Sequence, residues 1–169
     1  VVDNKWKVAN NEVELFASWT PSEASYKVRH VYKGVDGSED EVHEDQFTTT
    51  SDTEVTPSTK AVEGFNTPVA QAVQVSANAD TVITYTYTRK IYTLTVERKV
   101  GVKSVAVTAV TDGNVTPLGE DDEIANAYNY SVVYGAGFRM TSTPETGYST
   151  TGFTGLTATG NTYTMPYVD

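Results

Sequence analysis

The chain of 169 residues contains no cysteine and few basic side chains. Without cysteine it has no disulfide framework, no thiolate metal site and no cysteine nucleophile. Its 12 lysines and arginines are outnumbered by 22 acidic residues, which gives a formal net charge of −10 at pH 7. Phosphate backbones and anionic lipid surfaces repel a chain of this charge that has no basic arm. We therefore expect no nucleic-acid partner and no binding to anionic lipid.

Long apolar runs and the common helix-forming aliphatic residues are also scarce. No stretch approaches the roughly 20 apolar residues that cross a bilayer, so we expect no membrane insertion in this segment. There are four leucines and three isoleucines, against 27 threonines, 24 valines and 11 tyrosines. β-Branched and aromatic residues favour strands and disfavour helix interiors. The composition predicts a mostly β chain, and such a chain without cysteine fits bacterial surface proteins better than disulfide-stapled eukaryotic modules.

One order of features occurs twice along the chain: an alternating tyrosine strand, a Thr-rich middle, a Gly-aromatic pair and a closing strand. Repetition at this spacing is typical of repeat proteins, in which each unit is small. The first copy opens at residues 26–32, passes Gly64-Phe65 and closes at 82–89, and the second opens at 92–96, passes Gly147-Tyr148 and ends near 163–166.

The repeat divides the chain into three parts. Residues 13–20 carry a closing-strand pattern with no opening strand before it, so residues 1–22 are interpreted as the end of a preceding unit. Residues 23–90 and 91–169 form the two copies, and units of about 70 residues lie near the lower size limit for independent folding. We expect short, stiff junctions between them, such as residues 89–91, and we interpret the chain as a piece of a longer repeat protein.

Local signals predict further elements. Asp52 is placed to cap one short helical turn before Pro57. Residues 36–45 and 118–123 are predicted as acidic loops, and 125–134 fits either a short helix or a strand. Residues 103–110 are expected to form a partner strand, and residues 137–143 a strand that ends at Pro144.

Three segments resemble repeats of Gram-positive bacterial surface proteins. Residues 1–21, through Val-Glu-Leu-Phe-Ala-Ser-Trp-Thr-Pro at 13–21, look like the end of an internalin-type B repeat. Residues 23–90 are similar to a mucin-binding-protein repeat, through Tyr-x-Val-x-His-x-Tyr, Gly64-Phe65 and Val-Ile-Thr-Tyr-Thr-Tyr. Residues 92–169 resemble a divergent B repeat, although Phe153 stands where such repeats often carry tryptophan.

The resemblance implies tandem small β-grasp (ubiquitin-like) modules, a mostly β fold of the α+β type with at most one short helix in each. It implies a secreted, wall-attached protein that serves adhesion or spacing. No catalytic residues come with these families, so none is carried over, and no cofactor is expected.

Two tyrosines are candidates for a glycan platform, because aromatic rings stack on sugars as readily as they fill cores. Tyr130 and Tyr134, near a Gly-Ala-Gly stretch, are predicted to be exposed, whereas Tyr85 and Tyr87 alternate with Thr and are predicted to be core. The alternative for every one of these rings is a place in the core.

A basic stripe on the strand 26–33 is the second candidate site. Lys27, Arg29 and Lys33 share its outer face on an otherwise acidic molecule and would suit sulfated or sialylated glycans. The alternative is that these cations keep an edge strand from pairing with another chain.

The remaining polar residues predict no reaction chemistry. His30 is expected in the core and His43 on the surface, and neither has a triad or metal pattern around it. The acidic loops lack the spacing of a calcium loop, so no metal site is predicted and thermal stability should not respond to calcium.

These observations predict a non-catalytic extracellular segment that acts as a stalk, spacer or adhesive arm at a bacterial cell surface. The alternative is a glycan- or mucin-binding module centred on residues 23–90. The expected partners are a host glycan, mucin or surface protein, and the isolated fragment is expected to be monomeric.

Overall fold

The computed structural model describes residues 8–9, 12–13, 16–77, 79–111, 113–149 and 151–168. Within these ranges the chain forms strands, turns and loops, and no helix. The prediction of a mostly β chain is confirmed. No helix long and apolar enough to cross a membrane occurs in the described ranges.

The middle unit is built on one four-stranded sheet with the order β4-β3-β8-β6. β3 runs antiparallel to β4 and parallel to β8, so β3 lies inside the sheet with a partner on each side. A separate antiparallel pair, β5 and β7, lies beside it. The strands are β3 (Glu23–Lys33), β4 (Glu39–Thr50), β5 (Thr53–Val55), β6 (Phe65–Asn66), β7 (Val73–Val75) and β8 (Thr81–Arg89).

The core of the middle unit lies on one face of β3 and β8. Alternation turns Val28 and Tyr32 of β3 inward, together with Ile83, Tyr85 and Tyr87 of β8. All five side chains are buried. The prediction that Tyr85 and Tyr87 are core residues is confirmed.

The C-terminal unit consists of two three-stranded antiparallel sheets, β11-β12-β9 and β10-β13-β14. Their facing sides enclose a second core that includes Val96, Val132 and Phe138. The strands are β9 (Ile91–Glu97), β10 (Val102–Ala109), β11 (Val115–Glu120), β12 (Ala127–Val133), β13 (Gly137–Pro144) and β14 (Tyr163–Thr164). The ambiguous segment 125–134 is therefore mostly strand, and the strands expected at 103–110 and 137–143 are confirmed.

The N-terminal segment contains the short pair β1 (Val8–Ala9) and β2 (Glu12–Val13). A continuous strand over 13–20 was expected from the sequence. Residues 16–20 form no strand, and Phe16 and Trp19 are exposed, so that part of the prediction is wrong. Residues 1–7, 10–11 and 14–15, which also belong to the expected end of a preceding unit, lie outside the described residues.

Two local predictions in the middle unit are wrong. No helical turn follows Asp52; its φ of 58° is left-handed, and the chain continues directly into β5. The acidic stretch 36–45 is a loop only as far as Ser38, because β4 begins at Glu39 and pairs along the whole of β3. Cross-strand pairing outweighs the low strand propensity of Asp and Glu here. The second acidic loop is likewise shorter than expected, since β11 extends to Glu120.

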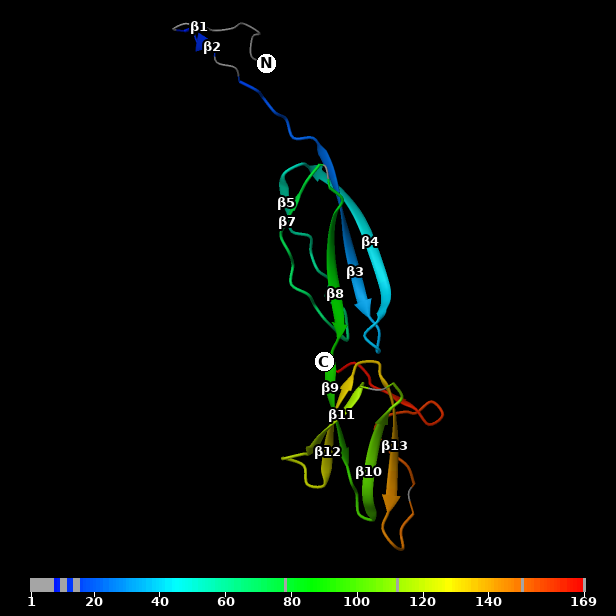
Figure 1. The fold of residues 1–169 in the computed structure, drawn as a ribbon. Coiled ribbons are helices and arrows are strands. Elements are labelled where there is room, and N and C mark those ends of the chain that lie inside the picture. Colours follow the sequence, from blue (N-terminus) through cyan, green and yellow to red (C-terminus); the bar gives the residue numbers. More distant parts are fainter. Residues whose placement is uncertain are drawn as a thin grey trace.

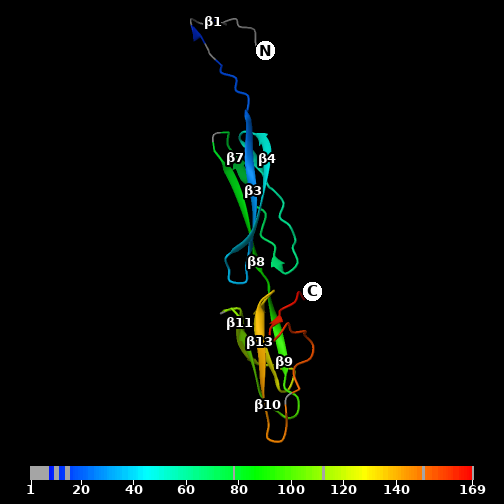
Figure 2. The same ribbon diagram turned by 90° about the vertical axis from the view of Figure 1, so that its right-hand side faces the viewer.

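The two units lie end to end, and β8 of the first runs almost directly into β9 of the second (Figure 1). The view at 90° shows the same elongated arrangement, with the N-terminal segment beyond the far end of the middle unit (Figure 2).

Candidate functional site

The junction between the two units is one residue long. β8 ends at Arg89 and β9 begins at Ile91, so Lys90 alone links the two sheets. Its backbone is bonded on both sides: Lys90 N donates to Gly64 O over 2.8 Å, and Tyr134 N donates to Lys90 O over 2.9 Å. The linker is therefore held by the middle unit through its N–H and by the C-terminal unit through its carbonyl.

The side chain of Arg89 joins both units. Its Nε donates to Lys33 O over 3.0 Å, and its Nη1 donates to Tyr134 O over 3.3 Å. Nη2 lies 3.5 Å from Asp40 Oδ2, and the side chain is only 17 % exposed. The guanidinium also lies 5.1 Å from the ring centre of Phe65 and 5.8 Å from that of Tyr134. One cation thus contacts the end of β3, the Gly-aromatic turn and the loop after β12.

The ring of Tyr134 occupies a space that only glycine leaves open. A Cβ atom on Gly64 would lie 2.1 Å from the Tyr134 ring, and Gly64 has a left-handed φ of +76°. The ring of Phe65 meets the same tyrosine edge to face at 6.1 Å. Gly135 is similarly restricted, since a Cβ there would lie 2.8 Å from Nη1 of Arg89. We call Gly64, Phe65, Arg89, Lys90 and Tyr134 the junction cluster.

Further contacts surround the junction cluster. The ammonium of Lys90 lies 5.7 Å from the ring centre of Tyr167, and that ring meets Tyr92 edge to face. Val35, in the turn between β3 and β4, packs on the hydrophobic core of the C-terminal unit. The two units therefore share apolar as well as polar contacts.

The sequence predicted only part of this cluster. The repeat pattern contains Gly64-Phe65, but nothing in it predicts that Tyr134 of the neighbouring unit packs against this pair. Arg89 was assigned to a junction without a role. The sequence feature that could have indicated the junction cluster is an arginine beside a one-residue linker, with glycines and aromatic residues nearby in both units.

The tyrosine candidates have different surroundings from those expected. Tyr130 is 7 % exposed, so its predicted exposure is wrong: it shares the inward face of β12 with Val132 and enters the core. Burial raises the pKa of its hydroxyl. Tyr134 is partly buried in the junction cluster, where its ring faces Gly64, Phe65 and Arg89. The structure does not bring the two rings together as one open platform.

The basic stripe lies on an interior strand. Lys27 Nζ is 2.9 Å and Arg29 Nε 3.6 Å from the carboxylate of Glu44 on β4, and the hydrogen bond to Glu44 raises the pKa of Lys27. Because β3 has partners on both sides, the alternative that these cations protect an edge is wrong. Lys33 is partly buried, and its carbonyl accepts the bond from Arg89.

Both histidines lie where the sequence placed them. His30 is 3 % exposed, its Nδ1 is hydrogen-bonded to Tyr87 Oη at 2.8 Å, and burial lowers its pKa. Lys60 N donates to the same hydroxyl over 3.0 Å. His43 is exposed and pairs with Glu41 at 2.6 Å.

The acidic loops bind their own backbone. Asp121 accepts hydrogen bonds from the side-chain amide of Asn129 and from the backbone N–H groups of Ile124 and Glu123, and these bonds lower its pKa. Asp36 is held in the same way by Ser38. Within the ranges that the structure describes, no group of three or more His, Asp or Glu side chains is placed to hold a metal ion.

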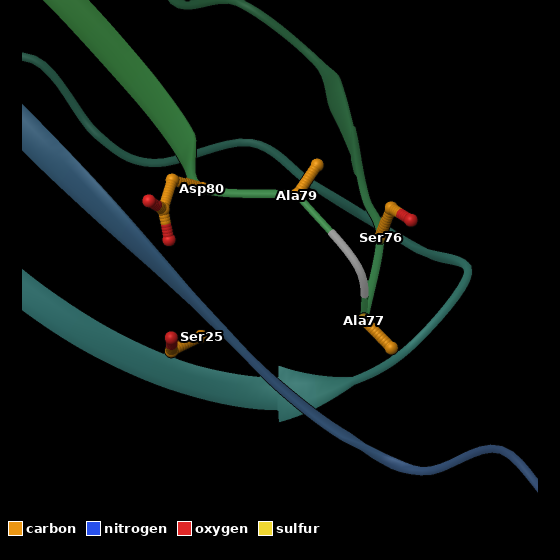
Figure 3. A pocket seen from close by; sticks show the side chains of 5 residues that line it. All are labelled: Ser25, Ser76, Ala77, Ala79 and Asp80. Atoms are coloured by element: carbon orange, nitrogen blue, oxygen red, sulfur yellow. The ribbon is translucent and has the colours of Figure 1, made fainter.

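A pair of shallow polar hollows lies at the far end of the middle unit. The first, of about 300 Å³, lies between β3 and the turn before β8 and is lined by Ser25, Ser76, Ala77, Ala79 and Asp80 (Figure 3). The second, of about 590 Å³, shares Ser76 and Ala77 and is also lined by Trp19 and Asp52. Trp19 is 88 % exposed. Hydroxyl and carboxylate groups beside an open indole ring can recognise a sugar.

Comparison with known proteins gives no match: no family model, no curated relative and no solved structure matches this chain.

Proposed function

We propose that this chain is a non-catalytic extracellular repeat segment of a cell-wall-attached bacterial surface protein. It acts as a stalk, spacer or adhesive arm in attachment to a host or surface. The repeat pattern and the resemblance of three segments to such proteins motivate the proposal, and the junction cluster is the observation that carries it.

A spacer must resist bending where its units meet, and the junction cluster provides that resistance. A one-residue linker leaves few free backbone torsions between the sheets. Hydrogen bonds that involve a charged group contribute about 1.5–3 kcal/mol each, and a cation over an aromatic ring about 0.5–2 kcal/mol. Arg89 makes both kinds of contact and is largely shielded from solvent. Repeats that contact only their neighbours in this way form stiff linear arrays.

The strand order of the middle unit supports a β-grasp-like fold. Its first and last long strands, β3 and β8, lie parallel at the centre of the sheet, with β4 and β6 at its edges. An up-and-down meander cannot give this order. Residues 51–80 form short strands and loops in place of a crossover helix. The C-terminal unit, with its two small sheets, gives no such support, so the fold proposal rests on the middle unit.

The absence of catalysis is part of the proposal. A reaction site needs a nucleophile or base in a cleft with groups that orient it. His30 is enclosed in the core beside Tyr87, and His43 pairs with a neighbouring carboxylate on the surface.

Small-angle scattering on the chain and on Arg89→Ala tests the spacer. We expect a rod-like profile for the native chain, and a shorter average length with greater flexibility for Arg89→Ala. The matched control is Arg139→Ala, which removes an exposed arginine from β13. A compact profile for the native chain, or identical profiles for all three proteins, would contradict the proposal.

A second candidate function is glycan or mucin binding by the middle unit. The specific observation is that exposed Trp19, in the segment before β3, lines the second hollow, which shares Ser76 and Ala77 with the first at the end of the middle unit. If this function holds, the chain binds mucin or a glycan array saturably, Trp19→Ala abolishes binding, and Phe16→Ala leaves it unchanged. Phe16 is equally exposed but does not line either hollow. No saturable binding by the native chain would leave the spacer as the sole role.

A further inference from the structure

A segment without strand partners connects β5 to β6 in the middle unit. Residues 56–62, which we call the strap, belong to no strand (Figure 1). Two buried tyrosines of β8 bind the strap by its backbone: Lys60 N donates to Tyr87 Oη over 3.0 Å, and Tyr85 Oη donates to Pro57 O over 2.7 Å. Because the strap lacks the ladder of hydrogen bonds that holds a strand, these bonds decide whether it stays in place.

The hydroxyl of Tyr87 is also hydrogen-bonded to His30, whose Nδ1 lies 2.8 Å away. The hydroxyl accepts the N–H of Lys60, so its own hydrogen needs an acceptor, and Nδ1 is the acceptor beside it. Nδ1 therefore carries no hydrogen, and neutral His30 is protonated on Nε2. Each bond of the chain from Lys60 to Tyr87 to His30 then has one donor and one acceptor.

Protonation of His30 disturbs this chain of hydrogen bonds. It places a hydrogen on Nδ1 and makes that nitrogen a donor. The N–H of the imidazolium and the N–H of Lys60 then both point at Tyr87 Oη, and the hydroxyl hydrogen loses its acceptor. A buried donor without a partner is costly, so the hydroxyl must rotate away from one of the two donors. The bond from the charged imidazolium is the stronger, so the bond from Lys60 is lost.

The surroundings of His30 oppose its protonation while the strap is in place. Burial is the largest effect that lowers its pKa, and the ammonium of Lys60 on the strap lowers it further. On β4, Asp45 raises the pKa and His43 lowers it, while the tyrosines of β8 beside the ring are uncharged below pH 8. Release of the strap removes the cation of Lys60 and admits water, so the pKa of His30 returns toward its ordinary value of 6.5. Acid therefore favours the released strap.

A series of aromatic contacts connects His30 to the junction cluster. The His30 ring centre lies 5.7 Å from that of Tyr87, which stacks on Tyr32 at 4.5 Å. Tyr32 meets Phe65 edge to face at 5.5 Å, and Phe65 in turn contacts Tyr134 of the C-terminal unit. The last residue of the strap also accepts a hydrogen bond from the N–H of Phe65 over 3.1 Å. Displacement of the strap therefore removes support from Phe65.

From these contacts we infer that His30 is an acid-sensitive switch: its protonation releases the strap and, through Phe65, loosens the junction between the two units. Above about pH 6.5 the strap is held and the junction is fixed. As the pH falls below this value, the equilibrium constant for strap release rises by up to about tenfold per pH unit. The effect on the junction rests on the proposed spacer role, whereas release of the strap does not depend on it.

Amide hydrogen exchange of the whole chain between pH 8 and 5 tests the switch, with each rate divided by that of an unstructured peptide at the same pH. We expect the protection of the Lys60 amide to fall by up to about tenfold per pH unit below pH 6.5. The Lys90 amide, which donates to Gly64 O, should lose protection over the same range. Both should exchange faster than the Val31 amide of interior strand β3, because the strap opens without unfolding of the sheet.

Three variants separate the switch from other effects of acid. His30→Gln cannot take up a proton, so the protection of its Lys60 amide should hardly change with pH. His43→Gln is the matched control, since it removes the exposed histidine, and it should behave like the native chain. Tyr87→Phe keeps the ring and removes the hydroxyl, so its Lys60 amide should already have lost protection at pH 8.

Several outcomes would overturn the inference. Two are protection of Lys60 that does not change with pH in the native chain, and a pH dependence that persists in His30→Gln. Equal protection of Lys60 and Val31 at every pH would show that acid unfolds the whole unit instead of releasing the strap. Loss of protection at Lys60 without loss at Lys90 would overturn the coupling to the junction. Low protection of Lys90 already at pH 8 would instead contradict the spacer proposal.

Discussion

Gly64→Ala should lower the free energy of unfolding by more than the backbone cost of replacing a glycine that has a left-handed φ. Any residue other than glycine at a left-handed φ costs roughly 1–2 kcal/mol. At Gly64 the new methyl group would also lie 2.1 Å from the Tyr134 ring, which must then move away from Phe65 and Arg89. Overpacking of this kind costs typically about 1–3 kcal/mol more. The expected loss is therefore about 2–5 kcal/mol.

The matched control for this substitution is Gly37→Ala. Gly37 has nearly the same φ, +78°, and no described atom lies within 4 Å of the position its Cβ would take. Urea unfolding should show a loss of only about 1–2 kcal/mol for Gly37→Ala, the backbone part alone. Tyr134→Ala should remove the excess cost of Gly64→Ala in the double variant. The close contact between Gly64 and the Tyr134 ring would be refuted if both glycine substitutions lowered the free energy of unfolding equally. It would also be refuted if Tyr134→Ala did not remove the excess cost of Gly64→Ala.

Three further outcomes are expected. Burial lowers the pKa of His30, whereas in the unfolded chain its pKa is near 6.5, so its contribution to stability should be fully present above about pH 6.5 and fall as the pH decreases through this value. The free energy of unfolding, measured between pH 8 and 5, should depend less on pH in His30→Gln than in the native chain and as in the native chain in His43→Gln. Tyr130→Ala should cost about 3–5 kcal/mol in the same assay, because it empties a core position; a loss no larger than that of an exposed tyrosine, Tyr148, would contradict its burial. Added calcium should leave the melting temperature unchanged, and a clear rise would reveal a cation site.

The alternation of inward and outward side chains along single strands could be predicted from the sequence. The period of two separated the core face from the outer face in residues 82–89 and in residues 26–32 with the exception of Val31, which is buried although it alternates with the core face. The same rule applied to β12 would have placed Tyr130 on the face of Val132. Its exposure was instead inferred from the glycines that follow, and that inference was wrong.

Contacts between segments that are distant in the sequence could not be predicted from such local patterns. The strand character of residues 39–45 depends on pairing with β3, where Glu44 meets two cations. The junction cluster likewise depends on Tyr134 reaching Gly64, some 70 positions away in the chain. Local propensity does not encode such pairings, since they are decided by which segments the fold brings together.

The central claim is that the junction cluster holds the two units in one fixed orientation. Residual dipolar couplings of backbone amides, measured separately for residues 23–89 and 91–168 of the same weakly aligned chain, test it most directly. A fixed junction predicts that one alignment tensor fits both sets of couplings in the native chain and that two different tensors are needed for Arg89→Ala. Two tensors of different magnitude in the native chain would contradict the claim.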